Sequence, residues 1–275
     1  MNTSEFKTMA RRFGADLVGI APYERFDGLK SEQHPRSIFP QGKSVVVIGR
    51  RILRGSLRGI EEHSEMMSIY QNFGLFALED QFLAKTSYDI VMFVEKLGRE
   101  AVPLFAYEWN GENQGTPVAP GKPGPNVHIP PRFAAVKAGL GVIGRHGMLL
   151  TPEYGTRQRL AMLLTDLELD ADPELELDYC SGCQDCVKAC PLDALAADGH
   201  YDERRCRKCG NGAVACDAGR FFAIDRVAAS CGRACLASLE RRGLLKQKFN
   251  HPFRVRAPWS CDAAGKFSRA MEAVK

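Results

Sequence analysis

The chain has 275 residues, of which 45% are hydrophobic and 25% are charged, and its formal net charge is +4 at pH 7. These values are typical of a globular protein with one large domain or two modest ones. The longest apolar runs are strand-sized, well short of the roughly 18 residues that a membrane span needs, so we expect no membrane helix. The N-terminus has no apolar stretch of signal-peptide length. Ten cysteines then indicate metal binding in the reducing cytoplasm rather than disulfides.

Helical and strand patterns alternate through the first 165 residues. Phe6, Met9 and Phe13 recur at helical spacing, whereas residues 44–49 form a β-branched apolar run typical of a strand covered on both faces. In chain order, the patterns predict a helix at 3–13, strands at 16–21 and 44–49, a helix at 62–98, a strand at 101–104, a helix at 132–138 and a strand at 157–165. Four glycines and six prolines between residues 111 and 131 predict an extended loop with a functional role. This order predicts an α/β or α+β fold.

Charge is distributed unevenly along the chain. Residues 201–275 contain sixteen Lys or Arg and seven Asp or Glu, which gives +9 and leaves about −5 for the rest. Residues 166–178 carry an acid at every second position and no base. We interpret this acidic run as a solvated strand edge; the alternative is a docking face for a basic electron donor. The basic C-terminal part either attracts an acidic partner or nucleic acid, or neutralises bound metal clusters.

The cysteine spacing carries the strongest functional signal. Cys180, Cys183, Cys186 and Cys190 follow the pattern Cys-x2-Cys-x2-Cys-x3-Cys-Pro. In two-cluster ferredoxins, the first three thiolates of this run bind one 4Fe–4S cluster and the fourth binds the other. Further cysteines are therefore required, and five follow: Cys206, Cys209, Cys216, Cys231 and Cys235. A zinc site uses four ligands, usually as two separated pairs, so the spacing favours iron–sulfur clusters and electron transfer over zinc or disulfides.

Several segments resemble the epoxyqueuosine reductase family and the related core of reductive dehalogenases. They are AAVKAGLGVIGRHGMLLTPEYG at 134–155, RLAMLLTDLELD at 159–170 and CSGCQDCVKACPLDAL from Cys180 onward. The segments GADLVGIAP and SVVVIGRR near the N-terminus, and DERRC at 202–206, fit the same pattern. The resemblance covers about residues 4–240 and is specific in combination, although the glycine segment alone would be a weak signal.

The resemblance implies a fold and a chemistry. Residues 1–174 would form a nitroreductase-like α/β (α+β) domain that binds base-off cobalamin, residues 175–240 a double 4Fe–4S ferredoxin-like module, and residues 241–275 a basic extended tail. In such proteins the clusters feed electrons to cobalt, and the reduced corrinoid cleaves a substrate. The implied protein is a cytoplasmic oxidoreductase with a small-molecule substrate and an electron donor such as a ferredoxin or flavodoxin.

The same resemblance suggests corrinoid-binding residues. Gly139, Gly141 and Gly144 let the backbone approach a ligand closely, and backbone N–H groups there could meet the corrinoid tail. Arg145, directly after them, is a fourth candidate. The alternative is that Gly139 only caps the preceding helix.

The chain also departs from the family. Epoxyqueuosine reductases carry a catalytic aspartate shortly before the AGLG segment, whereas residues 124–128 here contain no acid. His128 is the candidate proton donor in its place, and Tyr107 in the preceding loop is a second candidate. The helical-repeat tail of many epoxyqueuosine reductases is not found either. Both departures argue against tRNA as the substrate.

The second cysteine group differs from the family pattern Cys-x2-Cys-x3-Cys-Pro. Ala228 stands where the first cysteine should be and Leu236 where the proline should be. The resemblance then implies one cluster on Cys180, Cys183, Cys186 and Cys235. The other takes Cys190, Cys206, Cys231 and either Cys209 or Cys216. Cys261 is left over as an unligated thiol.

Three functions compete at this stage. The first is a corrinoid-dependent iron–sulfur reductase, which the intact AGLGVIG segment favours. The second is a two-cluster electron-transfer protein without corrinoid that serves a partner enzyme, which the missing catalytic acid favours. The third, a zinc-stabilised nucleic-acid binder built on the basic tail, is disfavoured by the cysteine spacing.

Overall fold

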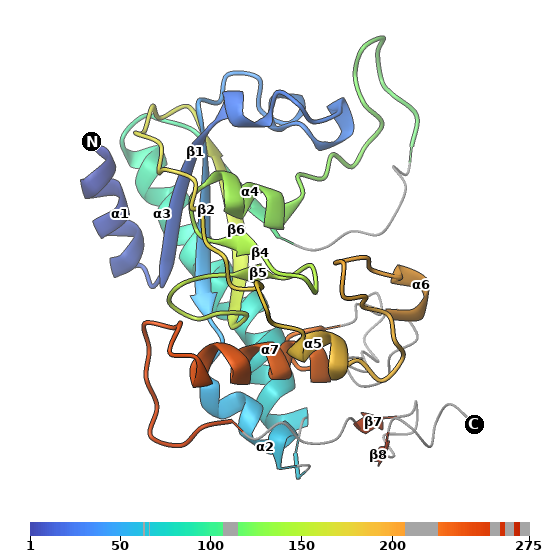
Figure 1. Ribbon diagram of the computed structural model, residues 1–275. Coiled ribbons are helices and arrows are strands. Elements are labelled where there is room, and N and C mark those ends of the chain that lie inside the picture. The colour runs from blue at the N-terminus through green and yellow to red at the C-terminus, as the bar shows by residue number, and fades with distance from the viewer. Residues whose placement is uncertain are drawn as a thin grey trace. The chain divides into compact units, whose positions relative to one another are not determined.

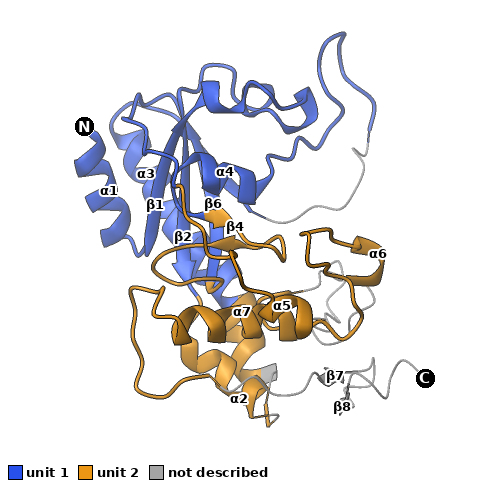
Figure 2. Cartoon of the chain, viewed as in Figure 1, with its two compact units in different colours: residues 1–51, 77–141, 158–175 blue, residues 52–76, 142–157, 176–275 orange. Residues whose placement is uncertain are grey.

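The computed structural model describes residues 1–62, 64–65, 67–106, 115–206 and 225–253, together with the backbone of two short strands at 259–261 and 267–269. The chain forms two compact units (Figure 2). Unit 1 comprises residues 1–51, 77–141 and 158–175, and unit 2 comprises residues 52–76, 142–157 and 176–275. Unit 2 combines two earlier segments, 52–76 and 142–157, with the cysteine-bearing part of the chain. The predicted domain boundary between residues 174 and 175 stays a prediction.

Unit 1 is built on a four-stranded antiparallel sheet in the order β1-β2-β6-β3 (Figure 1). Its strands are β1 (Leu17–Pro22), β2 (Ser44–Arg51), β3 (Ala101–Phe105) and β6 (Gln158–Thr165). Strand β2 lies between β1 and β6 and is buried from Ser44 to Gly49, as its unbroken apolar run predicts. Because every strand pair is antiparallel, unit 1 is of the α+β rather than the α/β kind.

Helices pack against this sheet and complete the core. Helices α1 (Thr3–Arg12) and α3 (Ala84–Lys96) bury Phe6 and Ile90 against Val46 and Ile48 of β2. Helix α4 (Pro131–Lys137) contacts β1, β2 and β6. Gly19 of β1 permits this close approach, because a Cβ atom there would lie 2.3 Å from the carbonyl oxygen of Ala138.

Shorter helical segments complete the first half of the chain. Three 3-10 turns follow β1, namely η1 (Tyr23–Phe26), η2 (Ser31–Gln33) and η3 (Pro35–Ser37). The stretch at about 62–98 that was predicted to be mostly helical contains the π-helical η5 (Met67–Phe76) and η6 (Leu78–Leu83) and the helix α3, and α2 (Arg58–Glu61) precedes it. The stretch ends at Gly98 as expected, where φ is +69°.

Unit 2 consists of short elements arranged around the cysteines. They are η4 (Arg54–Leu57), α2, η5, the hairpin of β4 (Val142–Ile143) and β5 (Leu149–Leu150), α5 (Asp185–Lys188), α6 (Glu203–Cys206) and α7 (Ser230–Arg241). Helix α5 packs against α7. The backbones of β7 (Trp259–Cys261) and β8 (Phe267–Arg269) form a second antiparallel pair. In the part of the chain that the structure describes, no helix is long and apolar enough to cross a membrane.

Candidate metal centres

The first candidate centre is a cavity in unit 2 lined by four cysteines. They are Cys180, Cys183, Cys186 and Cys235. A tight turn presents the first two, because the Cys183 N–H donates to the Cys180 carbonyl over 3.1 Å and Gly182 between them has φ +65°. The carboxylate of Asp178 fixes this turn by accepting the N–H groups of Cys180 and Ser181, at 3.1 and 2.9 Å. These four cysteines are the set assigned above to one cluster.

The second candidate centre is a separate cavity lined by three further cysteines of unit 2: Cys190, Cys206 and Cys231. They come from the turn after α5, from α6 and from the first turn of α7. The same three were assigned to the other cluster. Both candidates for its fourth ligand, Cys209 and Cys216, lie outside the described residues.

Helix α7 contributes one cysteine to each cavity. Cys231 and Cys235 are four residues apart and therefore lie about one helical turn apart. Cys231 lines the second cavity and Cys235 the first. This arrangement matches the crossed ligation of two-cluster ferredoxins, in which a cysteine near one cluster binds the other.

Two thiols of the first cavity, those of Cys186 and Cys235, are poorly suited to ionise alone. Burial, followed by the neighbouring Cys180 and Cys183, raises the pKa of Cys186 to about 11. Burial is also the largest cause of the raised pKa of Cys235, which lies well above its ordinary value. The other three thiols of the cavity raise this pKa further. Buried thiols this close together need a compensating positive charge to become thiolates, and the irons of a cluster would supply it. The residues therefore fit an iron–sulfur cluster.

Within the described ranges, no group of three His, Cys, Asp or Glu side chains is arranged to hold one metal ion.

Hydrogen bonds reach several of the described cysteine sulfurs. The backbone N–H groups of Arg145 and Ala194 donate to Sγ of Cys180 and of Cys190, each over 3.3 Å. The side chains of Cys183 and Ser238 are in hydrogen-bond contact at 3.5 Å. Hydrogen bonds to cluster sulfurs are among the features that set cluster potentials. Ser238 and Ala194 were missed by the sequence reasoning, because nothing in their local pattern distinguishes them.

The residues predicted to bind the corrinoid contact their own chain. Gly139 has φ +70° and its N–H donates to the Val136 carbonyl, so it caps α4; a Cβ there would lie 2.3 Å from the Pro173 carbonyl oxygen. A Cβ on Gly144 would lie 2.8 Å from Leu150 and 2.9 Å from His146. Gly141 is buried. Arg145 is partly buried and lines the first cysteine cavity. Added Cβ atoms on Gly139 and Gly144 would thus meet protein atoms, and the corrinoid-binding role of these residues stays a prediction.

The predicted proton donors stay predictions. His128 is half-buried in unit 1, and its backbone N–H donates to the Glu32 carbonyl over 2.9 Å. Tyr107 lies outside the described residues, as does the side chain of Cys261.

The acidic run makes local contacts within unit 1. The Asp172 carboxylate pairs with Lys7 and accepts the Ile20 N–H over 2.9 Å. Glu174 pairs with Lys137 over 3.0 Å. These contacts favour the interpretation of the run as part of the unit's own surface over that of a docking face.

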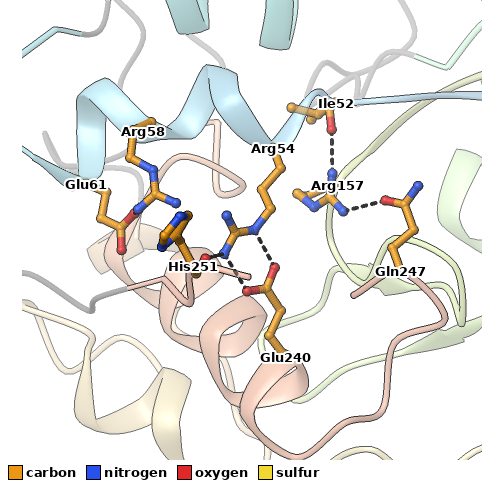
Figure 3. A network of polar contacts seen from close by, with 8 residues as sticks. All are labelled: Ile52, Arg54, Arg58, Glu61, Arg157, Glu240, Gln247 and His251. Atoms are coloured by element: carbon orange, nitrogen blue, oxygen red, sulfur yellow. Dashed lines mark hydrogen bonds and ion pairs between the residues drawn. The ribbon is translucent and has the colours of Figure 1, made fainter. Parts of the chain in front are cut away.

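A buried arginine network holds the C-terminal end of α7 (Figure 3). Nε and Nη2 of Arg54 donate to the two carboxylate oxygens of Glu240, each over 2.8 Å, and Nη2 also donates to the His251 carbonyl over 2.6 Å. The Arg54 guanidinium lies 4.5 Å from the ring centre of Phe249 and 3.9 Å from that of Phe253. Arg54 therefore links η4, the last turn of α7 and the segment at 249–253.

Arg157 fixes the same segment from another side (Figure 3). It is only 1% exposed. Nη1 donates to the Ile52 carbonyl over 2.8 Å, and Nη2 donates to the Gln247 side chain over 3.1 Å. The start of the basic tail is thus held within unit 2 by two arginines that sequence patterns did not single out. Their partners are distant in the sequence, so local periodicity carries no trace of these contacts.

No family model matches the chain. A tetrachloroethene reductive dehalogenase from Desulfitobacterium hafniense is 28% identical over 69% of the chain and 38% of its own length. An epoxyqueuosine reductase from Lactococcus garvieae is 41% identical, but only over 26% of the chain and 20% of its own length. The chain thus spans well under half the length of these curated relatives.

Solved structures show the same two kinds of protein. Epoxyqueuosine reductase from Streptococcus thermophilus has a TM-score of 0.56 at 19% identity, covering 84% of this chain and 66% of that one. A reductive dehalogenase described as B12-dependent has a TM-score of 0.53 at 17% identity, covering 97% and 39%. An epoxyqueuosine reductase solved with a tRNA stem loop has a TM-score of 0.55 at 18% identity, covering 90% and 66%. These likenesses show the fold and confirm the resemblance to epoxyqueuosine reductases and reductive dehalogenases.

Proposed function

We propose that the chain is a cytoplasmic iron–sulfur oxidoreductase that holds two 4Fe–4S clusters and delivers their electrons for a reductive cleavage. The observation that carries the proposal is the pair of cysteine-lined cavities in unit 2. One cluster would be held by Cys180, Cys183, Cys186 and Cys235. The other would be held by Cys190, Cys206, Cys231 and either Cys209 or Cys216. When bound, such clusters accept and release single electrons. The electron donor would be a small redox protein such as a ferredoxin or flavodoxin.

The chain's own residues would shape the electron transfer. Asp178 and Gly182 hold the first cysteine turn in a conformation that presents two sulfurs to one cavity. Cys186 is buried and would limit the access of water to its side of the first centre. The N–H groups of Arg145 and Ala194 would stabilise negative charge on the ligand sulfurs.

We also propose that the reductase binds a corrinoid. Similarity to a B12-dependent dehalogenase supports it. When bound, a corrinoid would supply the cobalt-centred chemistry that cleaves the substrate bond. The contacts of Gly139 and Gly144 with their own chain do not add support, so we assign no reaction step to this cofactor. The substrate is proposed to be a small molecule. That tRNA is not the substrate remains a prediction, since one similar structure holds a tRNA stem loop.

The second candidate function is a two-cluster electron carrier without a corrinoid. The close contacts that added Cβ atoms on Gly139 and Gly144 would make with protein atoms favour it. The absence of an acid at residues 124–128 favours it as well.

Metal analysis tests for the two 4Fe–4S clusters, which both candidate functions require. After anaerobic reconstitution, we expect about eight iron and eight sulfide per chain. Cys183→Ser should lose about half of each, whereas Cys261→Ser, at the cysteine predicted to be unligated, should lose none. About four irons in the wild type, or stoichiometric zinc, would contradict the proposal.

A corrinoid titration separates the two functions. Cob(II)alamin added to the reconstituted protein should change from the base-on to the base-off spectrum if the reductase proposal is correct. No change at cofactor concentrations of tens of micromolar would exclude binding stronger than about −6 kcal/mol. The electron-carrier function would then replace the reductase function.

A further inference from the structure

Arg226 and Tyr201 form a hydrogen-bonded cation–π pair in the wall of the second cysteine cavity. Nη2 of Arg226 donates to the Tyr201 hydroxyl over 2.6 Å, and Nη1 donates to the His146 carbonyl over 3.0 Å. The guanidinium carbon lies 4.3 Å from the centre of the Tyr201 ring. Three separate contacts therefore fix the arginine beside a cavity that Cys206 also lines.

The tyrosine hydroxyl lies in the wall of the same cavity as Cys206. Its oxygen accepts the hydrogen bond from Arg226, so its own proton remains free to be donated. The cation polarises the hydroxyl, which makes it a stronger hydrogen-bond donor.

A cation and a polarised hydroxyl act on a nearby cluster in a predictable way. Reduction adds an electron, and cluster potentials respond to net charge and to hydrogen bonds at the sulfurs. A nearby cation and an O–H donor stabilise the reduced cluster more than the oxidised one. The reduction potential should therefore rise.

We infer that Tyr201, polarised by Arg226, is a positioning residue that raises the reduction potential of the cluster held by Cys190, Cys206 and Cys231. This inference rests on the proposed function, because it requires the second cluster. Its reach is local. Near the first cavity, Sγ of Cys180 accepts a hydrogen bond from the backbone N–H of Arg145, which a change of the Tyr201 side chain does not remove.

The test compares two tyrosines in the reconstituted full chain. Tyr201→Phe keeps the ring and removes the hydroxyl, and Tyr179→Phe makes the same change in the wall of the first cavity. Both cluster potentials are measured by redox titration with electron paramagnetic resonance detection. The signals are assigned by the loss of one of them in Cys183→Ser.

We expect Tyr201→Phe to lower the reduction equilibrium constant of the second cluster about tenfold. This is about 59 mV toward negative potential for a one-electron couple. The first cluster should not change, and Tyr179→Phe should leave the second cluster unchanged. Arg226→Gln should lower the same potential, and Arg226→Lys should recover part of the loss because it restores the cation.

Failure of the inference is distinct from failure of the proposed function. Full iron in Tyr201→Phe with an unchanged second potential would overturn the inference and leave the proposed function standing. Equal shifts of both clusters, or loss of the second cluster's iron, would also overturn it, because either would indicate a general structural role. A wild type without two clusters would remove the proposed function itself.

Discussion

The backbone N–H of Arg145 donates a hydrogen bond to Sγ of Cys180 over 3.3 Å. This contact links the end of the AGLGVIG segment to the first cysteine of the ferredoxin-like run, and both residues belong to unit 2. Part of the segment that was predicted to bind a corrinoid therefore also contacts a predicted metal ligand. The domains expected from the sequence are continuous segments, so Arg145 and Cys180 were expected in different domains. Local sequence patterns do not reveal that residues 142–157 belong to the same compact unit as the cysteines.

The pair of Arg54 and Glu240 should be essential to the stability of unit 2. The two side chains are only 8% and 10% exposed. Arg54→Met leaves a buried carboxylate without its cation, so we expect the free energy of unfolding to fall by about 3–5 kcal/mol. Anaerobic urea unfolding of the reconstituted protein measures this.

Two comparisons test the reason for that loss. Replacing both partners by Met should recover most of the stability, because the unpaired charge is then gone. Lys85→Met breaks a surface pair with Asp89 at a lysine that is 74% exposed, and should cost less than about 0.5 kcal/mol. Similar losses for Lys85→Met and Arg54→Met would show that burial is not the cause.

The sequence predicted the parts of this fold that depend on neighbouring residues. The apolar run at 44–49 predicted β2, and the family resemblance implied the two groups of thiols that line the two cavities. It did not predict the order β1-β2-β6-β3, because strand order depends on which distant segments pair. The sequence patterns also did not predict the contact between Arg54 and Glu240, since an ion pair between positions far apart in the chain leaves no local pattern.

Glycine substitutions should separate backbone strain from steric contact. Gly55 has no positive φ and open space around its Cβ position, so Gly55→Ala should be nearly neutral or slightly stabilising. Gly98 has φ +69° and equally open space, so Gly98→Ala should cost about 1–2 kcal/mol from strain alone. Gly139→Ala adds the 2.3 Å contact with the Pro173 carbonyl and should cost more. Urea unfolding gives this order, and a loss for Gly139→Ala no larger than that for Gly98→Ala would contradict it.

Tyr23 should make unit 1 sensitive to alkali. Its side chain is 0% exposed, and its hydroxyl has no hydrogen-bond partner within the described residues. Burial raises the pKa of Tyr23, although the nearby Arg36 lowers it in part. Tyrosine in the unfolded chain loses its proton near pH 10, so Tyr23 contributes full stability below that pH and less as the pH rises above it.

Tyr23→Phe should remove both the unpartnered hydroxyl and this alkaline loss. At pH 7 we expect the free energy of unfolding to rise by about 1 kcal/mol. Between pH 9 and 11 the variant should lose less stability than the wild type, as measured by urea midpoints. Tyr88→Phe, at a side chain that is 64% exposed, serves as the control and should change neither property. A wild type and a Tyr23→Phe variant with parallel pH profiles would refute the assignment.

The fourth ligand of the second cluster can be identified by iron loss. Cys206 and Cys209 are separated by two residues, so one loop can present both thiolates with little strain. We therefore expect Cys209→Ala to lose about half of the iron and Cys216→Ala to keep all of it. Anaerobic iron and sulfide analysis of both variants, prepared in parallel with the wild type, makes the comparison. Iron loss only in Cys216→Ala would transfer the assignment to Cys216, and full iron in both variants would leave Cys261 as the cysteine to replace next.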